Sequence, residues 1–136
     1  MNCVRAVIAA DTNVIVRLLT GDEPRQTTKA RRLFDAETVF LPKTVLLEVE
    51  WVLRRLYRLD HAAIVDALDA LISLPNVRCE DEPVVRQALA WRRAGLDFAD
   101  ALHLAASHTV ERFATFDRAL VKAAAAAASG VSVFEP

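Results

Sequence analysis

The sequence predicts an α/β protein, a three-layer α/β/α sandwich with a mostly parallel, five-stranded central sheet. Short apolar runs alternate with longer segments of helical periodicity along the whole chain, which is typical of parallel strands joined by helices. The length of 136 residues fits one domain with a sizeable core. Because we find neither an internal repeat nor a linker, we expect a single domain over residues 1–136.

Each apolar run is bounded by residues that favour turns or helix ends. The predicted strands cover residues 4–10, 38–41, 76–80, 112–116 and 131–135, of which the first is expected to be buried. Helices are predicted over residues 14–19, 25–36, 43–59, 61–74, 83–94, 97–107 and 117–128. In the third helix, Leu46, Val49, Leu53 and Leu56 recur at helical spacing and predict its buried face.

Composition excludes several classes of protein. Hydrophobic residues make up 54% and charged residues 26% of the chain, which is unlike a disordered protein. The formal net charge of −1 means that any contact with nucleic acid must come from local patches. No apolar run approaches the roughly 20 residues that span a bilayer, and the N-terminus has no signal-peptide pattern. We therefore expect a cytoplasmic protein without a membrane partner.

Acidic residues fall where a parallel sheet binds its ligands, outside the carboxyl ends of the strands. Asp11 directly follows the first predicted strand, and Asp117 follows the fourth. Asp97 and Asp100 begin the helix that leads into the fourth strand, and Glu48 lies in the first two turns of the helix after the second. Four separate segments thus each supply an acid.

Each acid also has an ordinary structural interpretation. Asp11, Asp97 and Asp117 are good helix N-caps, and an acid in the first turn is favoured by the helix dipole. Asp100 is explained less well, because an unpaired charge is costly at the start of an apolar helix. Glu48 could pair with an arginine such as Arg55.

Glu50 is the solvent-facing candidate of the same helix. Arg54 lies four residues beyond it, at the spacing of a surface ion pair.

Taken together, the acids favour a metal site. Clustered carboxylates repel one another unless a cation neutralises them, and Mg²⁺ or Mn²⁺ takes oxygen ligands without needing His or Cys. Such a cluster can activate water for phosphodiester hydrolysis. The chain lacks the GxxxxGK[ST], GxGxxG and GxSxG patterns of other enzyme classes.

Four stretches, in order over nearly the whole chain, give it a family resemblance. They are ADTNVIVRLLTGD, LPKTVLLEVEWVLRRLY, GLDFADALHLAAS and FATFDRAL. With these stretches the chain resembles a PIN-domain ribonuclease, and in particular a VapC-type toxin of a bacterial or archaeal toxin–antitoxin pair.

The resemblance implies a set of site residues and partners. It implies that Asp11, Glu48, Asp100 and Asp117 are catalytic and hold Mg²⁺ or Mn²⁺, and that Asp97, Asn13 and Thr115 support them. It further implies hydrolysis of structured RNA, a homodimer, and inhibition by a cognate antitoxin protein. Arg17, Arg92, Arg93 and Arg118 are candidates for contacts with RNA phosphates, although each is also typical of a solvated helix face.

Two other functions remain open from the sequence. A receiver-like, Mg²⁺-binding signalling domain would also carry acids at strand ends, but it needs an acidic pair after the first strand and a lysine after the fifth. A non-catalytic PIN binding module is the other alternative.

The chain also offers candidates for a dimer interface. Trp51, Tyr57 and Leu59 extend the apolar surface beyond what one buried helix face needs, although they could equally belong to the core.

Overall fold

The structure is a computed structural model that describes residues 6–136, and they form two compact units. The first unit ends at Glu82 and the second runs from Pro83 to Pro136. The first contains β1 (Val7–Ala9), α1 (Thr12–Thr20), α2 (Pro24–Ala36), β2 (Thr38–Leu41), α3 (Lys43–Arg55), α4 (His61–Ile72) and β3 (Val77–Cys79). The second contains α5 (Glu82–Arg93, which begins at the boundary residue), α6 (Phe98–Ala106), β4 (Arg112–Ala114), α7 (Arg118–Ala126) and β5 (Ser132–Phe134).

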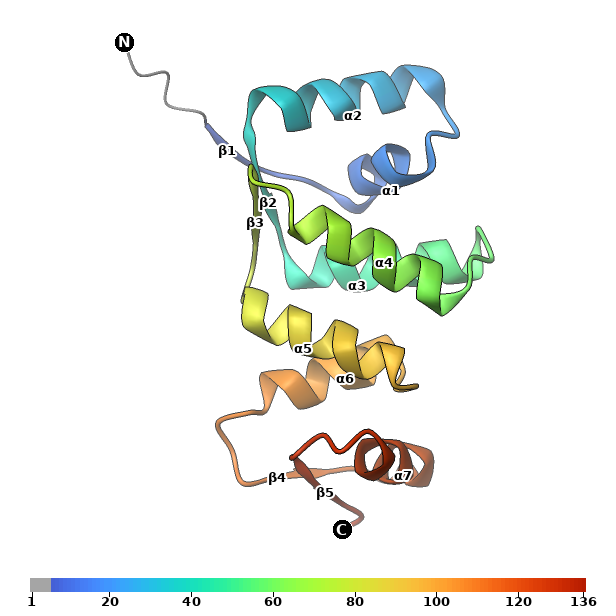
Figure 1. The fold of residues 1–136 in the computed structure, drawn as a ribbon, viewed down its shortest axis with the longest axis vertical. Helices are drawn as coiled ribbons and strands as arrows, with labels where there is room; N and C mark the ends of the chain where they lie inside the picture. The colour runs from blue at the N-terminus through green and yellow to red at the C-terminus, as the bar shows by residue number, and fades with distance from the viewer. Residues whose placement is uncertain (1–5) are drawn as a thin grey trace. The chain divides into compact units, whose positions relative to one another are not determined.

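The sheet of the first unit has three parallel strands in the order β1-β2-β3. In its register Ile8 lies opposite Val39, and Val39 opposite Val77. Each strand is joined to the next by two helices, as parallel strands require a crossover. Along the chain, α1 and α2 connect β1 to β2, and α3 and α4 connect β2 to β3 (Figure 1). The alternation of strands and helices predicted from the sequence is therefore confirmed.

The core of the first unit lies where the helices cover this sheet. Val39 and Leu41 of the central strand are fully buried, as are Ile15 of α1 and Leu68 of α4. The predicted apolar face of α3 is confirmed for Leu46, Val49 and Leu53, each at most 1% exposed. Leu56 is different: it is the C-cap residue just after α3, and 69% of its surface is exposed.

In the second unit, β4 and β5 form a separate, two-stranded parallel sheet. Phe113 lies opposite Val133 in its register, and the Arg112 guanidinium stacks 4.2 Å from the centre of the Phe134 ring. The buried side chains come mainly from α5 and α6, with Leu120 and Ala124 contributed by α7. The helices predicted over 97–107 and 117–128 are thus present, each shorter by one or two residues at its ends.

The expectation of one five-stranded central sheet is wrong for this structure. The described strands form a three-stranded and a two-stranded sheet, because β1 pairs only with β2 and β4 pairs only with β5. The pattern of apolar runs identifies strands but carries no information about which strands are neighbours. The packing of helices and strands in three layers stays a prediction.

The first strand also differs from its expected burial. Residues 4 and 5 of the predicted strand lie outside the described residues, and Val7 and Ile8 are 50% and 38% exposed. The physical reason is that β1 is an edge strand, which among the described strands pairs with β2 alone. Only Ala10, just after the strand, is buried as predicted.

Arg17 has a structural role in the first unit. Its Nε donates to Gln26 at 2.7 Å, and its Nη1 donates to Tyr57 at 3.2 Å and to Asp22 at 3.3 Å. The Tyr57 hydroxyl donates to Asp22 at 2.5 Å, and this bond is the main reason that the pKa of Asp22 lies below its ordinary value. These contacts join the end of α1 to α2 and to the turn after α3. Arg17 is therefore engaged within the fold, unlike a cation that awaits an RNA phosphate.

Candidate metal and catalytic site

Asp11 is held by the beginning of α1. The residue follows β1 and is the N-cap of the helix, with its Oδ1 accepting a hydrogen bond from the Thr12 backbone N–H at 2.7 Å. The other carboxylate oxygen accepts no hydrogen bond from the described residues, and the side chain is exposed. The carboxylate is thus oriented by one oxygen while the second can bind a ligand.

Asp117 has the same arrangement at the beginning of α7. Its Oδ1 accepts hydrogen bonds from the backbone N–H groups of Ala119 at 2.9 Å and Leu120 at 3.2 Å. The hydroxyl of Thr115 accepts a hydrogen bond from the Asp117 backbone N–H at 3.0 Å. Thr115 therefore fixes the backbone of Asp117, a role in keeping with the supporting function that the sequence assigns to it.

Asp97 is the N-cap of α6, and Asp100 follows in the first turn. Oδ2 of Asp97 accepts a hydrogen bond from the Asp100 backbone N–H at 3.3 Å. The Asp100 carboxylate itself is half-buried and forms no hydrogen bond with a described residue. One carboxylate of this helix start therefore caps the helix, and the other stays without a partner.

The electrostatics of Asp100 show how close these acids are. Burial raises the pKa of Asp100 above its ordinary value of 3.8, and the negative charges of Asp97 and Asp117 raise it further. The charge of His103 acts in the opposite direction and is the smallest of the four influences. Within the second unit, three of the predicted acids are therefore near enough to repel one another.

Glu48 lies on the exposed side of α3 in the first unit. The helix begins after Pro42, whose side chain cannot cap it, and the Glu80 carboxylate instead accepts a hydrogen bond from the Lys43 backbone N–H at 2.8 Å. This contact from the end of β3 fixes the start of the helix that carries Glu48. No ion pair joins Glu48 to Arg55 in the described part of the chain.

The interpretation of Glu50 as a solvent-facing residue is wrong. Glu50 is 2% exposed, and its Oε1 accepts a hydrogen bond from Arg54 Nε at 3.0 Å. The predicted i,i+4 pair is present, but it lies against the core because Glu50 shares the face of Leu46, Val49 and Leu53. Glu50 therefore has a structural role, which leaves Glu48 as the accessible acid of α3.

The residues present fit a hard divalent cation in their chemistry. Asp11 and Asp117 each have one carboxylate oxygen available, Glu48 is exposed, and Asp100 carries a charge without a cationic partner. Carboxylate oxygens are the ligands that Mg²⁺ and Mn²⁺ prefer. Among residues 6–136, however, no three His, Cys, Asp or Glu side chains form a group that could hold a metal ion as they stand.

One polar residue beside Asp11 was not predicted from the sequence. Thr12 is 5% exposed, and its hydroxyl oxygen has no hydrogen-bond partner among residues 6–136. A buried hydroxyl without a partner is costly, so its retention next to a candidate ligand is consistent with a bound group at the start of α1. The Asp-Thr-Asn sequence could have drawn attention to it, since Thr and Asn flank the same helix start.

Of the other residues considered from the sequence, Asn13 is exposed in the first turn of α1. Arg92 donates to the Leu96 backbone carbonyl at 3.1 Å, and Arg118 pairs with Glu135 at 3.3 Å. Two of the candidate phosphate-binding arginines of the second unit therefore have contacts within their own unit.

The comparisons with known proteins identify the family. The sequence profile described as the PIN domain matches residues 8–126. No curated protein matched. Among solved structures, the chain is similar to the crystal structure of Mycobacterium tuberculosis VapC20, described as a sarcin-ricin loop cleaving toxin, with 24% identity over 96% of this chain and 100% of that one. The TM-score of that match is 0.42.

The assignment of Glu48 and Glu50 predicts different effects on stability. We expect Glu50→Ala to lower the free energy of unfolding by about 1–3 kcal/mol, since it removes a buried side chain with a charged hydrogen bond. Glu48→Ala, on the same helix, should change it by less than about 0.5 kcal/mol. Urea denaturation of both variants measures this difference. Equal losses would contradict the assignment of Glu50 to the core.

The raised pKa of Asp100 predicts a gain in stability when its charge is removed. Folding disfavours the charged form of Asp100. The contribution of this carboxyl group to the free energy of unfolding is therefore most favourable below pH 3.8, and it falls as pH rises through the higher folded-state pKa. In EDTA at neutral pH, Asp100→Asn should therefore be more stable than the wild type, and the difference should vanish below pH 3.8. Denaturation curves across pH test this, with Asp35→Asn, an exposed aspartate of α2, as the control. A loss of stability at neutral pH would contradict the interpretation.

Residues 8–126 cover most of the chain and extend across both compact units, and on this match the chain belongs to the PIN domain family.

Proposed function

We propose that the protein is a divalent-metal-dependent endoribonuclease in which Asp11, Glu48, Asp100 and Asp117 form the catalytic set. The observation that carries the proposal is that capping uses only one carboxylate oxygen of Asp11 and of Asp117. Because the family match includes both units, we further propose that residues 1–136 act as a single PIN domain.

The roles of the residues follow from their local chemistry. Asp11 and Asp117 would hold Mg²⁺ or Mn²⁺ through the oxygen that their helices leave available, and Asp100 would contribute the charge that lacks a partner. Glu48 would complete the set and position the attacking water. The bound ion would lower the pKa of that water and neutralise charge that develops on the phosphate. Asp97, Asn13 and Thr115 would hold the helix starts and the ligands in place.

The substrate and the regulatory partner come from the motifs that resemble VapC-type toxins. We propose structured RNA as the substrate and a cognate antitoxin protein as the inhibitor. None of the described helices is long and apolar enough to cross a membrane. For the localisation we propose the cytoplasm.

Substitution by Asn separates helix capping from metal binding. Asn caps helices about as well as Asp, but it carries no charge for a cation. We expect Asp11→Asn and Asp117→Asn to fold normally and to lose RNA cleavage by more than about 100-fold, because even residues outside the ligand set cost roughly 10–100-fold at metal sites. Cleavage of a labelled RNA stem-loop with Mg²⁺, and its loss in EDTA, gives the measurement.

The matched control for these variants is Asp60→Asn. Asp60 is the N-cap of α4, where its Oδ1 accepts from the Ala63 backbone N–H at 2.8 Å, and it lies outside the catalytic set. This variant should cleave RNA as the wild type does. If the Asp11 and Asp117 variants also kept full activity, the aspartates would be helix caps and the proposed function would be wrong.

A homodimer is the proposed assembly, and the end of α3 is its proposed interface. Trp51, Leu56 and Leu59 are 47%, 69% and 42% exposed, and large exposed apolar side chains of this kind are typical of interfaces. Tyr57, by contrast, uses its hydroxyl within the fold.

The proposed interface predicts an oligomeric state that a double substitution changes. We expect the Trp51→Asp/Leu56→Asp variant to be monomeric, because two charges would have to be buried in the interface. Light scattering on the purified chain measures the mass. Leu74→Asp, at another exposed apolar residue, should remain dimeric. A monomeric wild type would contradict the proposed dimer.

A further inference from the structure

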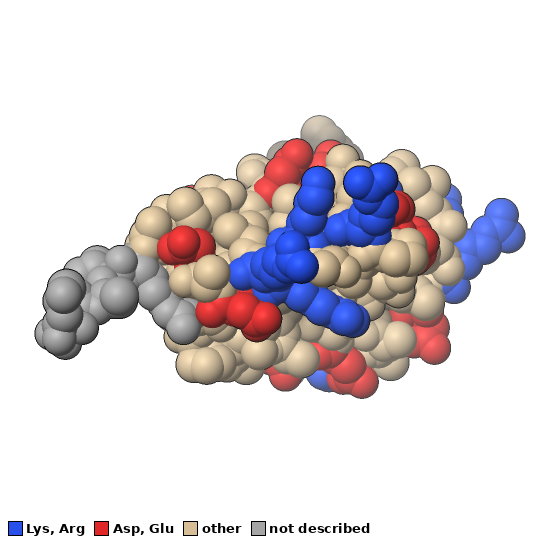
Figure 2. All heavy atoms as spheres, turned by 90° about the horizontal axis from the view of Figure 1, so that it is seen from above, with Lys and Arg blue, Asp and Glu red and all other residues tan. Residues whose placement is uncertain are grey.

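A stripe of positive charge runs along the outer face of α2. Arg25, Lys29 and Arg32 are spaced by four and three residues and are all exposed. With 100° per residue, these positions fall opposite the buried side of the helix, which carries Thr27, Ala30 and Phe34. Figure 2 looks onto this side of the molecule and shows Lys and Arg side chains gathered there. We refer to Arg25, Lys29 and Arg32 as the α2 stripe.

The fold itself does not use the α2 stripe. None of its three side chains forms a hydrogen bond or ion pair with a residue in the described range 6–136. Like charges four residues apart repel, and Arg25 lies in the first turn, where the helix dipole disfavours a cation. A helix face that served solubility alone would carry both positive and negative side chains, whereas Asp35 is the single acid of α2. The arrangement is therefore complementary to an anionic partner.

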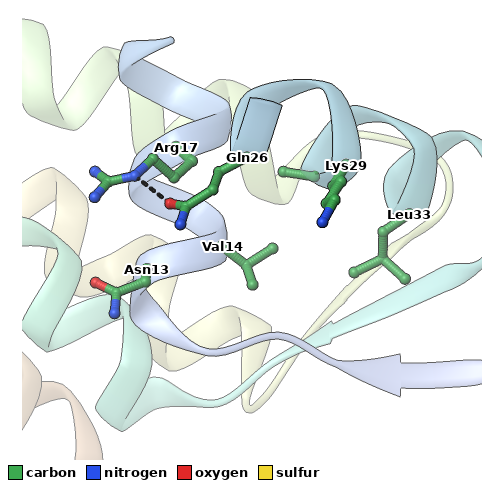
Figure 3. A pocket seen from close by; sticks show the side chains of 7 residues that line it. Asn13, Val14, Arg17, Gln26, Lys29 and Leu33 are labelled. Atoms are coloured by element: carbon green, nitrogen blue, oxygen red, sulfur yellow. Dashed lines mark hydrogen bonds between the residues drawn. The ribbon is translucent and has the colours of Figure 1, made fainter. Parts of the chain in front are cut away.

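A hollow of about 360 Å³ lies beside the α2 stripe, between α1 and α2. Figure 3 shows that Val14 comes from α1 and Leu33 from α2, and with Ala30 they form its apolar lining. The amide groups of Asn13 and Gln26 supply polar edges, and the carbonyl oxygen of Gln26 is fixed by the bond from Arg17. Lys29 belongs both to the stripe and to the lining of the hollow.

An unpaired nucleotide has the chemistry that fits this combination. Its base offers an apolar face with hydrogen-bonding edges, and the adjoining phosphates require cations at a spacing set by the backbone. A peptide helix would need apolar anchors over two or more turns, and three small or medium apolar side chains do not supply them. Within the first unit the hollow is also near Asp11, since Asn13, which lines it, follows Asp11 by two residues in the first turn of α1.

We propose that the α2 stripe and the adjacent hollow bind a single-stranded segment of RNA, with phosphates on Arg25, Lys29 and Arg32 and one base in the hollow. This inference rests on the proposed ribonuclease function and names the surface that would orient the substrate. It assigns to α2, which carries none of the predicted catalytic acids, the role of positioning a looped strand beside the start of α1.

Binding measured without cleavage tests the proposal. The full chain carrying Asp11→Asn is titrated in EDTA against a fluorescent RNA stem-loop and against a blunt RNA duplex, over a series of salt concentrations. Adding Arg25→Gln/Lys29→Gln/Arg32→Gln should weaken binding of the stem-loop by about tenfold or more and reduce the slope of log affinity against log salt by about 2. Adding Leu33→Gln instead should weaken stem-loop binding by about tenfold, leave the salt slope unchanged, and leave duplex binding unaffected.

The matched control replaces three other exposed cations, Arg55→Gln/Arg58→Gln/Arg78→Gln, and produces the same change in net charge. Thermal melting checks that every variant is folded. If this control weakens binding as much as the α2 variant, or if the α2 variant binds as before, the proposed RNA surface is wrong. A protein partner is then the remaining occupant of α2.

Cleavage assays with Asp11 restored separate this inference from the proposed function. RNA cleavage that persists unchanged in the α2 variant would overturn the inference while the ribonuclease function stands. If instead no form of the chain cleaves RNA, including the wild type with Mg²⁺, the proposed function fails as well.

Discussion

The hydrogen bonds between aspartate side chains and the first N–H groups of the helices are the constraint on which the candidate site depends. α1, α6 and α7 each begin at an aspartate whose side chain accepts one or two of these N–H groups. The N–H groups need an acceptor because they have no partner within the helix. As a result, Asp11, Asp97 and Asp117 are held in defined orientations by bonds that the helices require in any case, and folding itself positions the carboxylates.

Asp100 is not explained by helix capping. The cap of α6 is already supplied by Asp97, so the Asp100 carboxylate is not needed for the helix, and its burial beside two other acids makes its charge unfavourable. Neither helix capping nor burial therefore explains why an aspartate stands at this position. A charge that weakens the fold is the feature most directly associated with function, since active sites accept strain that the rest of the fold compensates.

The sequence predicted local structure much better than it predicted pairing and burial. The strand at 38–41 coincides with β2, and the aspartate caps were recognised because capping depends on residues adjacent in the chain. The edge position of β1 and the two separate sheets depend on contacts between distant segments, which periodicity does not encode. The prediction that Glu50 faces solvent was wrong for a related reason. Its charge suggested solvent, but its position on the face of Leu46, Val49 and Leu53 decided its burial once Arg54 was available as a partner.

The cationic side chains differ in whether they have partners within the fold. Arg17 was a candidate for phosphate binding from sequence, yet its guanidinium is engaged by Gln26, Asp22 and Tyr57 and holds α1 to its neighbours. The cations of the α2 stripe form no such contacts with residues 6–136, so no acidic side chain in that range neutralises them. Charged side chains therefore divide by whether the fold satisfies them. Those it satisfies, such as Arg17 and Glu50, maintain the structure. Those without a partner among residues 6–136, such as Asp100 and Lys29, are the ones to which we assign the proposed contacts with a cation and with a phosphate backbone.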